Sequence, residues 1–398
     1  MNCELKAPNF CGEGIIINNT NVPLTIHNQP SVQPDFDILV KKMQDATYYA
    51  DLQVRMEENE REDQSEFNRF SDIDMIYYYV HRKTHIREDR NRTEGTKKEY
   101  LNTLMQFYRY VLGNQLFFKN DVPDYKEEEG FKNLRPRHIR HFHEYLSIAP
   151  LGKKGNPYTA ATIQSKSAVL KAFLRWLNET GYLNYPLHEK IKDTSIIETE
   201  IPNKDFYPEE AFMLIDFYKN HPIHYALLTT LMITGLRVTE LAKAKWRDIS
   251  YDAATNAYWL EGVGKRNKKY LKRISPFYFE RIKAYRIRRK LSITLNKADE
   301  SPIFADRNLK HYSTKNLSNY IVKIILDSKL PFLEGRENRV TPHSFRHAYA
   351  IYLYRQGADL FTIQKELGHS DPKTTERYLE KAIRMENSAG HFISDDAF

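Results

Sequence analysis

The sequence has few cysteines, no long apolar segment and no familiar metal-binding string. Cys3 and Cys11 are its only cysteines, which fits a reducing compartment. We expect two ordinary thiols, although the pair could form one tether. No apolar run reaches the roughly 18–20 residues that a membrane span needs, and residues 1–10 lack the apolar core of a secretory signal. Without a CxxC pair or an HExxH string, no metal or other cofactor is expected, although the 14 histidines could still assemble a metal site in space.

Charge is present in quantity and is unevenly distributed. The chain has 60 Lys and Arg against 52 Asp and Glu, a net charge of +8. Residues 1–80 hold 6 of these basic and 14 of these acidic residues, a balance of −8, so residues 81–398 hold 54 and 38, a balance of +16. The basic part favours a polyanionic partner, because Lys and Arg displace condensed counterions from phosphates. The acidic part is a poor phosphate binder, and its deletion is expected to leave DNA binding unchanged.

Residues 1–192 are expected to be mainly helical. In the acidic segment the pattern predicts a hairpin at residues 14–26 and a helix at residues 35–55. Apolar spacings of three and four then predict a compact helical domain over residues 82–192. Its helices are expected at residues 96–112, at residues 137–146 and through residues 163–177, where Gly181 ends the last. Basic side chains that either face a DNA groove or decorate a solvated surface are Lys153, Lys154, Lys166, Lys171 and Arg175.

The C-terminal half reads as a separate mixed domain. Residues 193–205 lack periodicity and contain Pro202, which predicts a linker. Residues 206–398 combine helices with a β-hairpin at residues 258–275. The predicted fold is therefore mainly α with a small β component: an acidic extension over residues 1–80, a helical domain, a linker, and a mixed α+β domain with a C-terminal tail.

Polar side chains gather at predicted helix starts within residues 341–378. Thr341 and Asp371 each precede a proline, as is typical of an N-cap followed by proline at the first helical position. His343 and Arg346 are spaced i and i+3, on one face of the first of these helices. Two basic groups beside the positive end of a helix dipole are unfavourable unless an anion binds there. Tyr378 lies on the second helix, so the segment predicts an anion site with a nearby hydroxyl.

Five short motifs follow one another along the second half of the chain. They are Thr-Gly-Leu-Arg-Val-Thr-Glu-Leu at 234–241, Gly-Lys-Arg-Asn-Lys at 264–268, Thr-Pro-His-Ser-Phe-Arg-His at 341–347, Leu-Gly-His-Ser at 367–370 and Thr-Thr-Glu-Arg-Tyr at 374–378. In kind and order they resemble the first-arginine motif, the lysine-bearing turn and the C-terminal signature of the tyrosine recombinases, also called the phage integrase family. The helical region is similar to that family's core-binding domain, so the resemblance covers roughly residues 82–385.

The residue types also make chemical sense for cutting DNA. A side-chain nucleophile such as Tyr378 stores the phosphodiester energy in a covalent intermediate, so rejoining needs no ATP. A tyrosine hydroxyl has a pKa of about 10, so its proton must be removed and its phosphate target polarised. Arg237 and Arg346 can hold the non-bridging oxygens and offset charge in the transition state. His343 can take or give a proton near neutrality.

Two further site residues rest more on the resemblance. It implies that Lys265 delivers a proton to the leaving 5′ oxygen, although Lys268 and Lys269 are close enough to exchange roles with it. It also implies that His369 donates a hydrogen bond to the scissile phosphate, where packing at a helix end is the alternative. Glu240 lies one turn beyond Arg237 and is expected to orient the site.

The predicted function is that of a site-specific DNA recombinase or integrase from a mobile genetic element. The resemblance implies a 3′-phosphotyrosyl bond, four protomers on synapsed double-stranded DNA, a four-way Holliday junction, and a tail beyond Tyr378 that docks on a neighbouring subunit. We expect a cytoplasmic, nucleoid-associated protein without a membrane partner, which could meet accessory or host proteins through residues 1–80. The alternatives are a DNA-binding regulator that keeps the fold without strand exchange, and a type IB topoisomerase that acts as a monomer.

Overall fold

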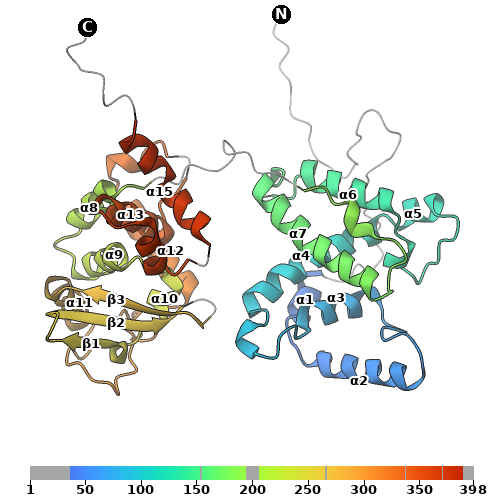
Figure 1. Ribbon diagram of the computed structural model, residues 1–398, viewed down its shortest axis with the longest axis horizontal. Coiled ribbons are helices and arrows are strands. Elements are labelled where there is room, and N and C mark those ends of the chain that lie inside the picture. The colour runs from blue at the N-terminus through green and yellow to red at the C-terminus, as the bar shows by residue number, and fades with distance from the viewer. Residues whose placement is uncertain are drawn as a thin grey trace, which may run out of the picture. The chain divides into compact units, whose positions relative to one another are not determined.

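The computed structural model describes residues 36–152, 155–193, 206–264, 267–336, 338–369 and 371–388. The chain forms two compact units, Met1–Ile201 and Pro202–Phe398, and each is described by itself (Figure 1). Both are helical, and the second adds a three-stranded sheet, which confirms the predicted fold class. The predicted hairpin at residues 14–26 and nearly all of the predicted linker lie outside the described residues. In the part of the chain that is described, no helix has the length and apolarity to cross a bilayer.

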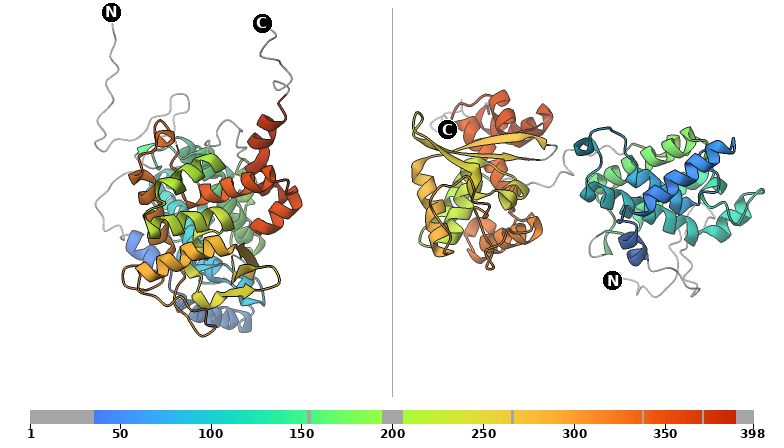
Figure 2. Two further views of the ribbon diagram at one scale, coloured as in Figure 1. Left: turned by 90° about the vertical axis from the view of Figure 1, so that its left-hand side faces the viewer. Right: turned by 90° about the horizontal axis from the view of Figure 1, so that it is seen from below.

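The first unit is built from helices around one core. They are α1 (Phe36–Lys42), α2 (Tyr48–Arg61), α3 (Asp72–His81), α4 (Glu94–Gly113), α5 (Gln115–Asp121), α6 (Pro136–Ile148) and α7 (Ala160–Glu179). The helices predicted at residues 96–112 and 137–146 are α4 and α6, and the third one is α7. Their apolar faces meet around Phe107, Phe131 and Phe173, which are almost fully buried. Figure 2 shows how the helices of this unit pack together.

Residues 36–81 share this core, which differs from the predicted separate extension. Leu52, Ile76 and Val80 are fully buried in the same cluster as the apolar residues of α4 and α7. Asp72 adds a polar link, because its carboxylate accepts hydrogen bonds from Tyr182 Oη and from the backbone N–H of Phe131, both at 2.8 Å. Burial raises the pKa of Asp72 to about 6. This acidic segment therefore also has an apolar face, formed mainly by α3. That face packs against helices of the basic part of the chain.

The helix predicted at residues 35–55 is interrupted, so that α1 and α2 are separate. Two residues of α3 stabilise the segment between α1 and α2. Tyr77 Oη donates to the Asp45 carbonyl at 2.6 Å, and a His81 ring nitrogen lies 2.8 Å from the Met43 carbonyl. Asp45 also accepts from the backbone N–H of Thr47 at 3.0 Å, a local turn that competes with helix. These tertiary partners override the helical periodicity of the segment.

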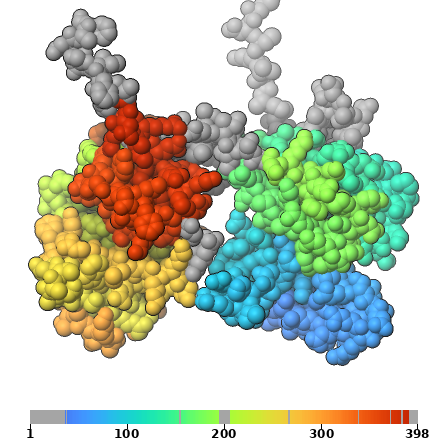
Figure 3. Space-filling model, in the orientation of Figure 1, coloured from blue at the N-terminus to red at the C-terminus, as the bar shows by residue number. Residues whose placement is uncertain are grey.

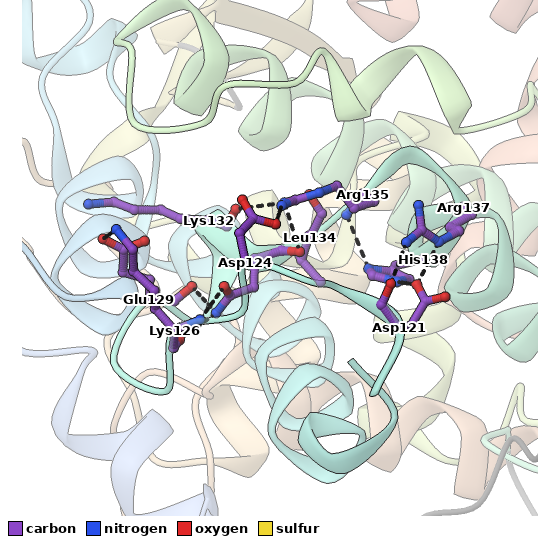
Figure 4. Close-up of polar contacts among 10 residues, drawn as sticks. Asp121, Asp124, Lys126, Glu129, Lys132, Leu134, Arg135, Arg137 and His138 are labelled. Carbon is purple, nitrogen blue, oxygen red and sulfur yellow. Dashed lines mark hydrogen bonds and ion pairs between the residues drawn. The ribbon is translucent and has the colours of Figure 1, made fainter. Parts of the chain in front are cut away.

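The first turn of α6 is fixed to the end of α5 by a buried histidine (Figure 4). The His138 ring accepts from the backbone N–H of Arg135 at 3.1 Å through Nδ1, and its Nε2 lies 2.7 Å from Asp121. Arg137 donates to the same carboxylate at 2.5 Å. With Nδ1 as an acceptor, His138 is neutral, and burial lowers its pKa despite the nearby carboxylate.

The second unit places helices against a small sheet. Its helices are α8 (Pro208–Phe217), α9 (Pro222–Thr234), α10 (Val238–Lys243), α11 (Pro276–Arg288), α12 (Thr314–Asp327), α13 (Pro342–Arg355), α14 (Leu360–Leu367) and α15 (Pro372–Glu386), and its strands are β1 (Ile249–Asp252), β2 (Ala257–Val263) and β3 (Lys269–Ile274). The strands pair in the antiparallel order β1-β2-β3. The β2–β3 hairpin is the predicted one, whereas β1 is not predicted by the sequence pattern. In the space-filling view of Figure 3, the atoms of the C-terminal residues (red) adjoin those of the residues that form the sheet (yellow).

Candidate active site

A cavity of about 620 Å³ lies in the second unit, between the β2–β3 hairpin and the ends of several helices. The start of α10 borders the cavity. Helices α13 and α15 contribute residues from their first halves, and α14 contributes residues from its end. Five of the six predicted catalytic residues line this cavity: Arg237, His343, Arg346, His369 and Tyr378. The sixth, Lys265, lies outside the described residues. Residues far apart in sequence are thus brought to one place.

The junction of α9 and α10 presents Arg237. Helix α9 ends at Gly235, whose φ of +57° is left-handed and suits glycine. Helix α10 then begins with a capping box, in which the Glu240 carboxylate accepts from the backbone N–H of Arg237 at 2.8 Å. The same carboxylate pairs with the Arg237 guanidinium at 2.9 Å and is almost fully buried. Glu240 therefore holds the Arg237 side chain in place.

Arg346 is buried in the first half of α13. Its side chain donates to the Gly235 carbonyl at 2.7 Å through Nη1 and to the Leu367 carbonyl through Nη2. A guanidinium has five N–H groups, so these two bonds leave others for the cavity. Burial, followed by repulsion from Arg237, lowers the pKa of Arg346 to about 10. The group stays charged at neutral pH, and a bound anion would relieve both costs.

Tyr378 meets His343 at the cavity wall. Tyr378 Oη and His343 Nε2 share a hydrogen bond of 2.9 Å. The Tyr378 ring also stacks on His347, with ring centroids 3.6 Å apart. Burial raises the pKa of Tyr378, although the Arg346 and Arg237 guanidinium groups oppose that effect. The hydroxyl is therefore protonated at rest and lies within reach of a base.

His369 follows the left-handed Gly368 that ends α14. Its Nδ1 lies 2.8 Å from Oγ1 of the buried Thr375, near the start of α15. Burial, together with the Arg346 and Arg237 guanidinium groups, lowers its pKa to about 4. His369 is thus a neutral ring at physiological pH, held by one nitrogen while the residue lines the cavity.

The lysine-bearing turn is described only in part. Lys268 and Lys269, the two alternatives to Lys265, both line the cavity. Lys268 is near enough to His369 to be among the charges that lower its pKa. The structure thus places Lys268 of this turn and Lys269, the first residue of β3, at the site.

Sequence reasoning missed four residues around the cavity. His347 stacks on Tyr378, and Lys272, Glu366 and Tyr349 form a connected polar cluster behind Arg346. Lys272 leaves a signal in the sequence, because it occupies an inward position of β3 where the alternation calls for an apolar residue. The other three give no such signal, since a tyrosine, a glutamate or a histidine on a helix is unremarkable until its partners are known.

The predicted DNA-contacting cations of the first unit have different surroundings. Lys166 donates to Gln106 at 2.8 Å and lies over the Tyr158 ring, and Lys171 pairs with Asp193 at 2.9 Å. Arg175 is exposed. Lys153 and Lys154 lie outside the described residues. The described part of the chain holds no group of three or more His, Cys, Asp or Glu side chains arranged to bind a metal ion.

Comparison with known proteins bears on this arrangement. Residues 204–384 match the family model described as the phage integrase family. Tyrosine recombinase XerC of Syntrophus aciditrophicus is 27% identical over 309 residues, which cover 74% of this chain and 90% of the relative. A tyrosine recombinase of Pseudothermotoga lettingae is 27% identical over 291 residues, which cover 73% and 88%.

Solved structures show the same fold. The XerH site-specific recombinase bound to a palindromic difH substrate gives a TM-score of 0.54 at 20% identity, over 73% of this chain and 79% of that one. A lambda integrase dimer bound to a COC′ core site gives 0.53 at 17% identity, over 76% and 75%. From the family match and the relatives together, residues 204–384 belong to the tyrosine recombinases, the phage integrase family, and the chain is a recombinase enzyme.

Proposed function

We propose that this recombinase cleaves and rejoins double-stranded DNA through a 3′-phosphotyrosyl bond at Tyr378. The observation that carries the proposal is the 2.9 Å hydrogen bond between Tyr378 Oη and His343 Nε2 in the wall of a cavity that Arg237 and Arg346 also line. A nucleophile, a base and two guanidinium groups in one cavity are the parts that phosphoryl transfer requires. A DNA phosphate is the anion that these cations would bind.

The geometry supports the following cleavage step. Tyr378 Oη attacks the phosphorus while His343 Nε2 accepts the phenolic proton. Arg237 and Arg346 donate to the non-bridging oxygens, whose negative charge grows in the transition state. The bond to the 5′ oxygen breaks, and one of Lys265, Lys268 and Lys269 protonates that oxygen. Rejoining is the reverse, with the 5′ hydroxyl attacking the phosphotyrosyl bond and Tyr378 leaving.

His369 is proposed to donate a hydrogen bond to the same phosphate. A neutral imidazole has one N–H, and the 2.8 Å contact of Nδ1 with Thr375 fixes which way the ring is turned. Thr375 can donate its hydroxyl hydrogen to Nδ1, which leaves the proton on Nε2. The neutral state follows from the lowered pKa of His369.

The assembly is proposed from the fold relationship. A lambda integrase tetramer bound to a Holliday junction shares the fold, with a TM-score of 0.51. We propose that this chain also acts as a tetramer on synapsed DNA, exchanging strands through such a junction.

In the first unit, the exposed Arg175 is proposed as a phosphate contact, with Lys153, Lys154, Lys166 and Lys171 as further candidates. The acidic segment within residues 1–80 is proposed to meet accessory or host proteins.

Covalent trapping tests the chemistry. The protein is incubated with nicked duplexes from its flanking element DNA, denatured, and examined for a slowly migrating protein–DNA adduct. Wild type and Tyr352→Phe, which alters an exposed tyrosine on α13, should form the adduct, and Tyr378→Phe should not. Footprinted binding without any adduct would instead favour a regulator that has lost strand exchange. Supercoil relaxation by a monomer without synapsis would favour a topoisomerase.

A further inference from the structure

An ion pair between the buried Lys272 and the partly exposed Glu366 borders the cavity and joins the hairpin to α14. Lys272 Nζ donates to the Glu366 carboxylate at 2.7 Å and also to the Glu366 carbonyl. The Lys272 side chain is only 3% exposed. Tyr349 Oη donates to the same carboxylate at 3.1 Å, and its ring lies 5.8 Å from Lys272 Nζ. The strand, the end of α14 and the middle of α13 thus meet at one carboxylate.

The position of Lys272 in the sheet is unusual for a charged residue. Its cross-strand partner is Leu260, whose other partner is Ile249, and both are buried on the inward face of the sheet. Burial lowers the pKa of Lys272, while Glu366 raises it. Desolvating the Lys272 charge offsets much of its attraction to the partly exposed Glu366, and apolar residues of similar volume often give equal stability. Stability alone therefore does not explain the pair.

The pair connects two parts of the site whose relative position matters: the lysine-bearing turn before β3 and the residues at the end of α14. Strand β3 begins directly after the lysine-bearing turn, and Glu366 precedes Leu367, whose carbonyl accepts from Arg346. His369 follows two residues later. A shift of the hairpin relative to α14 would therefore move the turn lysines relative to the phosphate-binding groups. Ion pairs with several hydrogen bonds fix one geometry, whereas apolar contacts tolerate sliding.

We propose that Lys272 and Glu366, with Tyr349, are positioning residues that hold the lysine-bearing turn in register with Arg346 and His369. They touch neither phosphate nor nucleophile in this role. The inference rests on the proposed cleavage chemistry, because the step it controls is proton delivery from the turn to the 5′ oxygen. General acid catalysis contributes about 10²–10⁴-fold, and small misplacements forfeit much of it.

Substrates with a 5′-bridging sulfur test this role. A thiolate leaves without a proton, so cleavage of a phosphorothiolate does not need the general acid. In the double variant Lys272→Met/Glu366→Leu the pair becomes apolar, which should preserve folding. We expect single-turnover adduct formation to fall at least about tenfold on the ordinary phosphodiester and to stay near the wild-type rate on the phosphorothiolate. Arg273→Met, which removes a cation from the exposed face of β3, should leave both rates unchanged.

The opposite outcomes are distinct. If the double variant cleaves both substrates at wild-type rates, or slows equally on both, the pair does not position the turn. The single variant Tyr349→Phe, which loses one hydrogen bond and keeps both charges, should show the same substrate selectivity with a smaller loss. If wild type itself forms no Tyr378 adduct with either substrate, the proposed chemistry fails, and the positioning role has nothing to act on.

Discussion

At the scale of single residues, neighbouring cations in the cavity repel one another, and a bound anion would relieve that repulsion. Arg237 and Arg346 repel each other, and Glu240 is the carboxylate that pairs with Arg237 within it. Burial is the main cause that lowers the pKa values of Arg346 and His369, and neighbouring cations are the second cause. A phosphate between these groups would reverse the second cause. DNA binding is therefore expected to raise both pKa values.

The pKa of His369 gives a prediction about pH. Its folded value of about 4 lies below the ordinary 6.5, so between these values the unfolded chain binds a proton that the native protein does not. The stability due to this group is complete above pH 6.5 and is lost as the pH falls toward 4. Denaturant unfolding at pH 7.5 and pH 5 should show a smaller loss for His369→Gln than for wild type.

The control for this experiment is His85→Gln, which removes an exposed histidine from the first unit and should keep the wild-type loss. Titration of the His369 ring followed by NMR measures the same quantity directly. A ring that titrates near pH 6.5 in the free protein would contradict the prediction. An upward shift on adding a duplex core site would support phosphate binding at the cavity.

At the scale of elements, the site depends on how helices end. Gly235 lets α9 stop and turn at φ +57°, and its carbonyl then accepts from Arg346. A Cβ at Gly235 would lie 2.2 Å from the Tyr349 ring. Gly357, beyond the end of α13, has φ +86° and open space around it. The two glycines therefore share a backbone requirement and differ in packing.

This difference predicts unequal effects of alanine. Gly357→Ala should cost about 1–2 kcal/mol of unfolding free energy, the usual cost of the left-handed conformation. Gly235→Ala adds a steric clash, for which overpacking costs a further 1–3 kcal/mol or so, and it displaces the Arg346 partner. Thermal or denaturant unfolding ranks the two variants, and adduct formation should be impaired only in Gly235→Ala. Equal losses of stability would show that the Tyr349 ring moves aside freely.

Local signals explain which elements could be predicted. The starts of α13 and α15 follow from Thr341, Asp371 and the prolines after them, because a cap and a fixed φ act within one turn. What a buried side chain contacts is not local. Lys272 and Glu366 are 94 residues apart, and Asp72 and Tyr182 are 110 apart. A lysine at an inward position of a strand indicates that it has a charged or polar partner, but only the folded structure shows which residue is the partner.

At the scale of the whole molecule, net charge was a poor guide to domain limits. The acidic residues of α2 are exposed, while Leu52 and Met56, which lie between them, enter the core of the first unit. Residues 36–80 contribute ten side chains to the buried apolar cluster of that unit. Charge reports on the outer face of an amphipathic element, whereas its membership in a domain depends on the inner face.

The two readings of residues 1–80 predict different results for deletion. Each large apolar side chain that leaves the core forfeits about 1.5–3 kcal/mol, so losing ten of them exceeds the roughly 5–15 kcal/mol that stabilises a domain. Deletion of residues 1–80 should therefore unfold the first unit, seen as loss of its cooperative unfolding transition and of core-site affinity. Deletion of residues 1–35 removes none of the contacts described above and should preserve both. If the longer deletion instead retains wild-type affinity and a cooperative transition, α1, α2 and α3 are an appendage, and the expectation drawn from charge alone is the correct one.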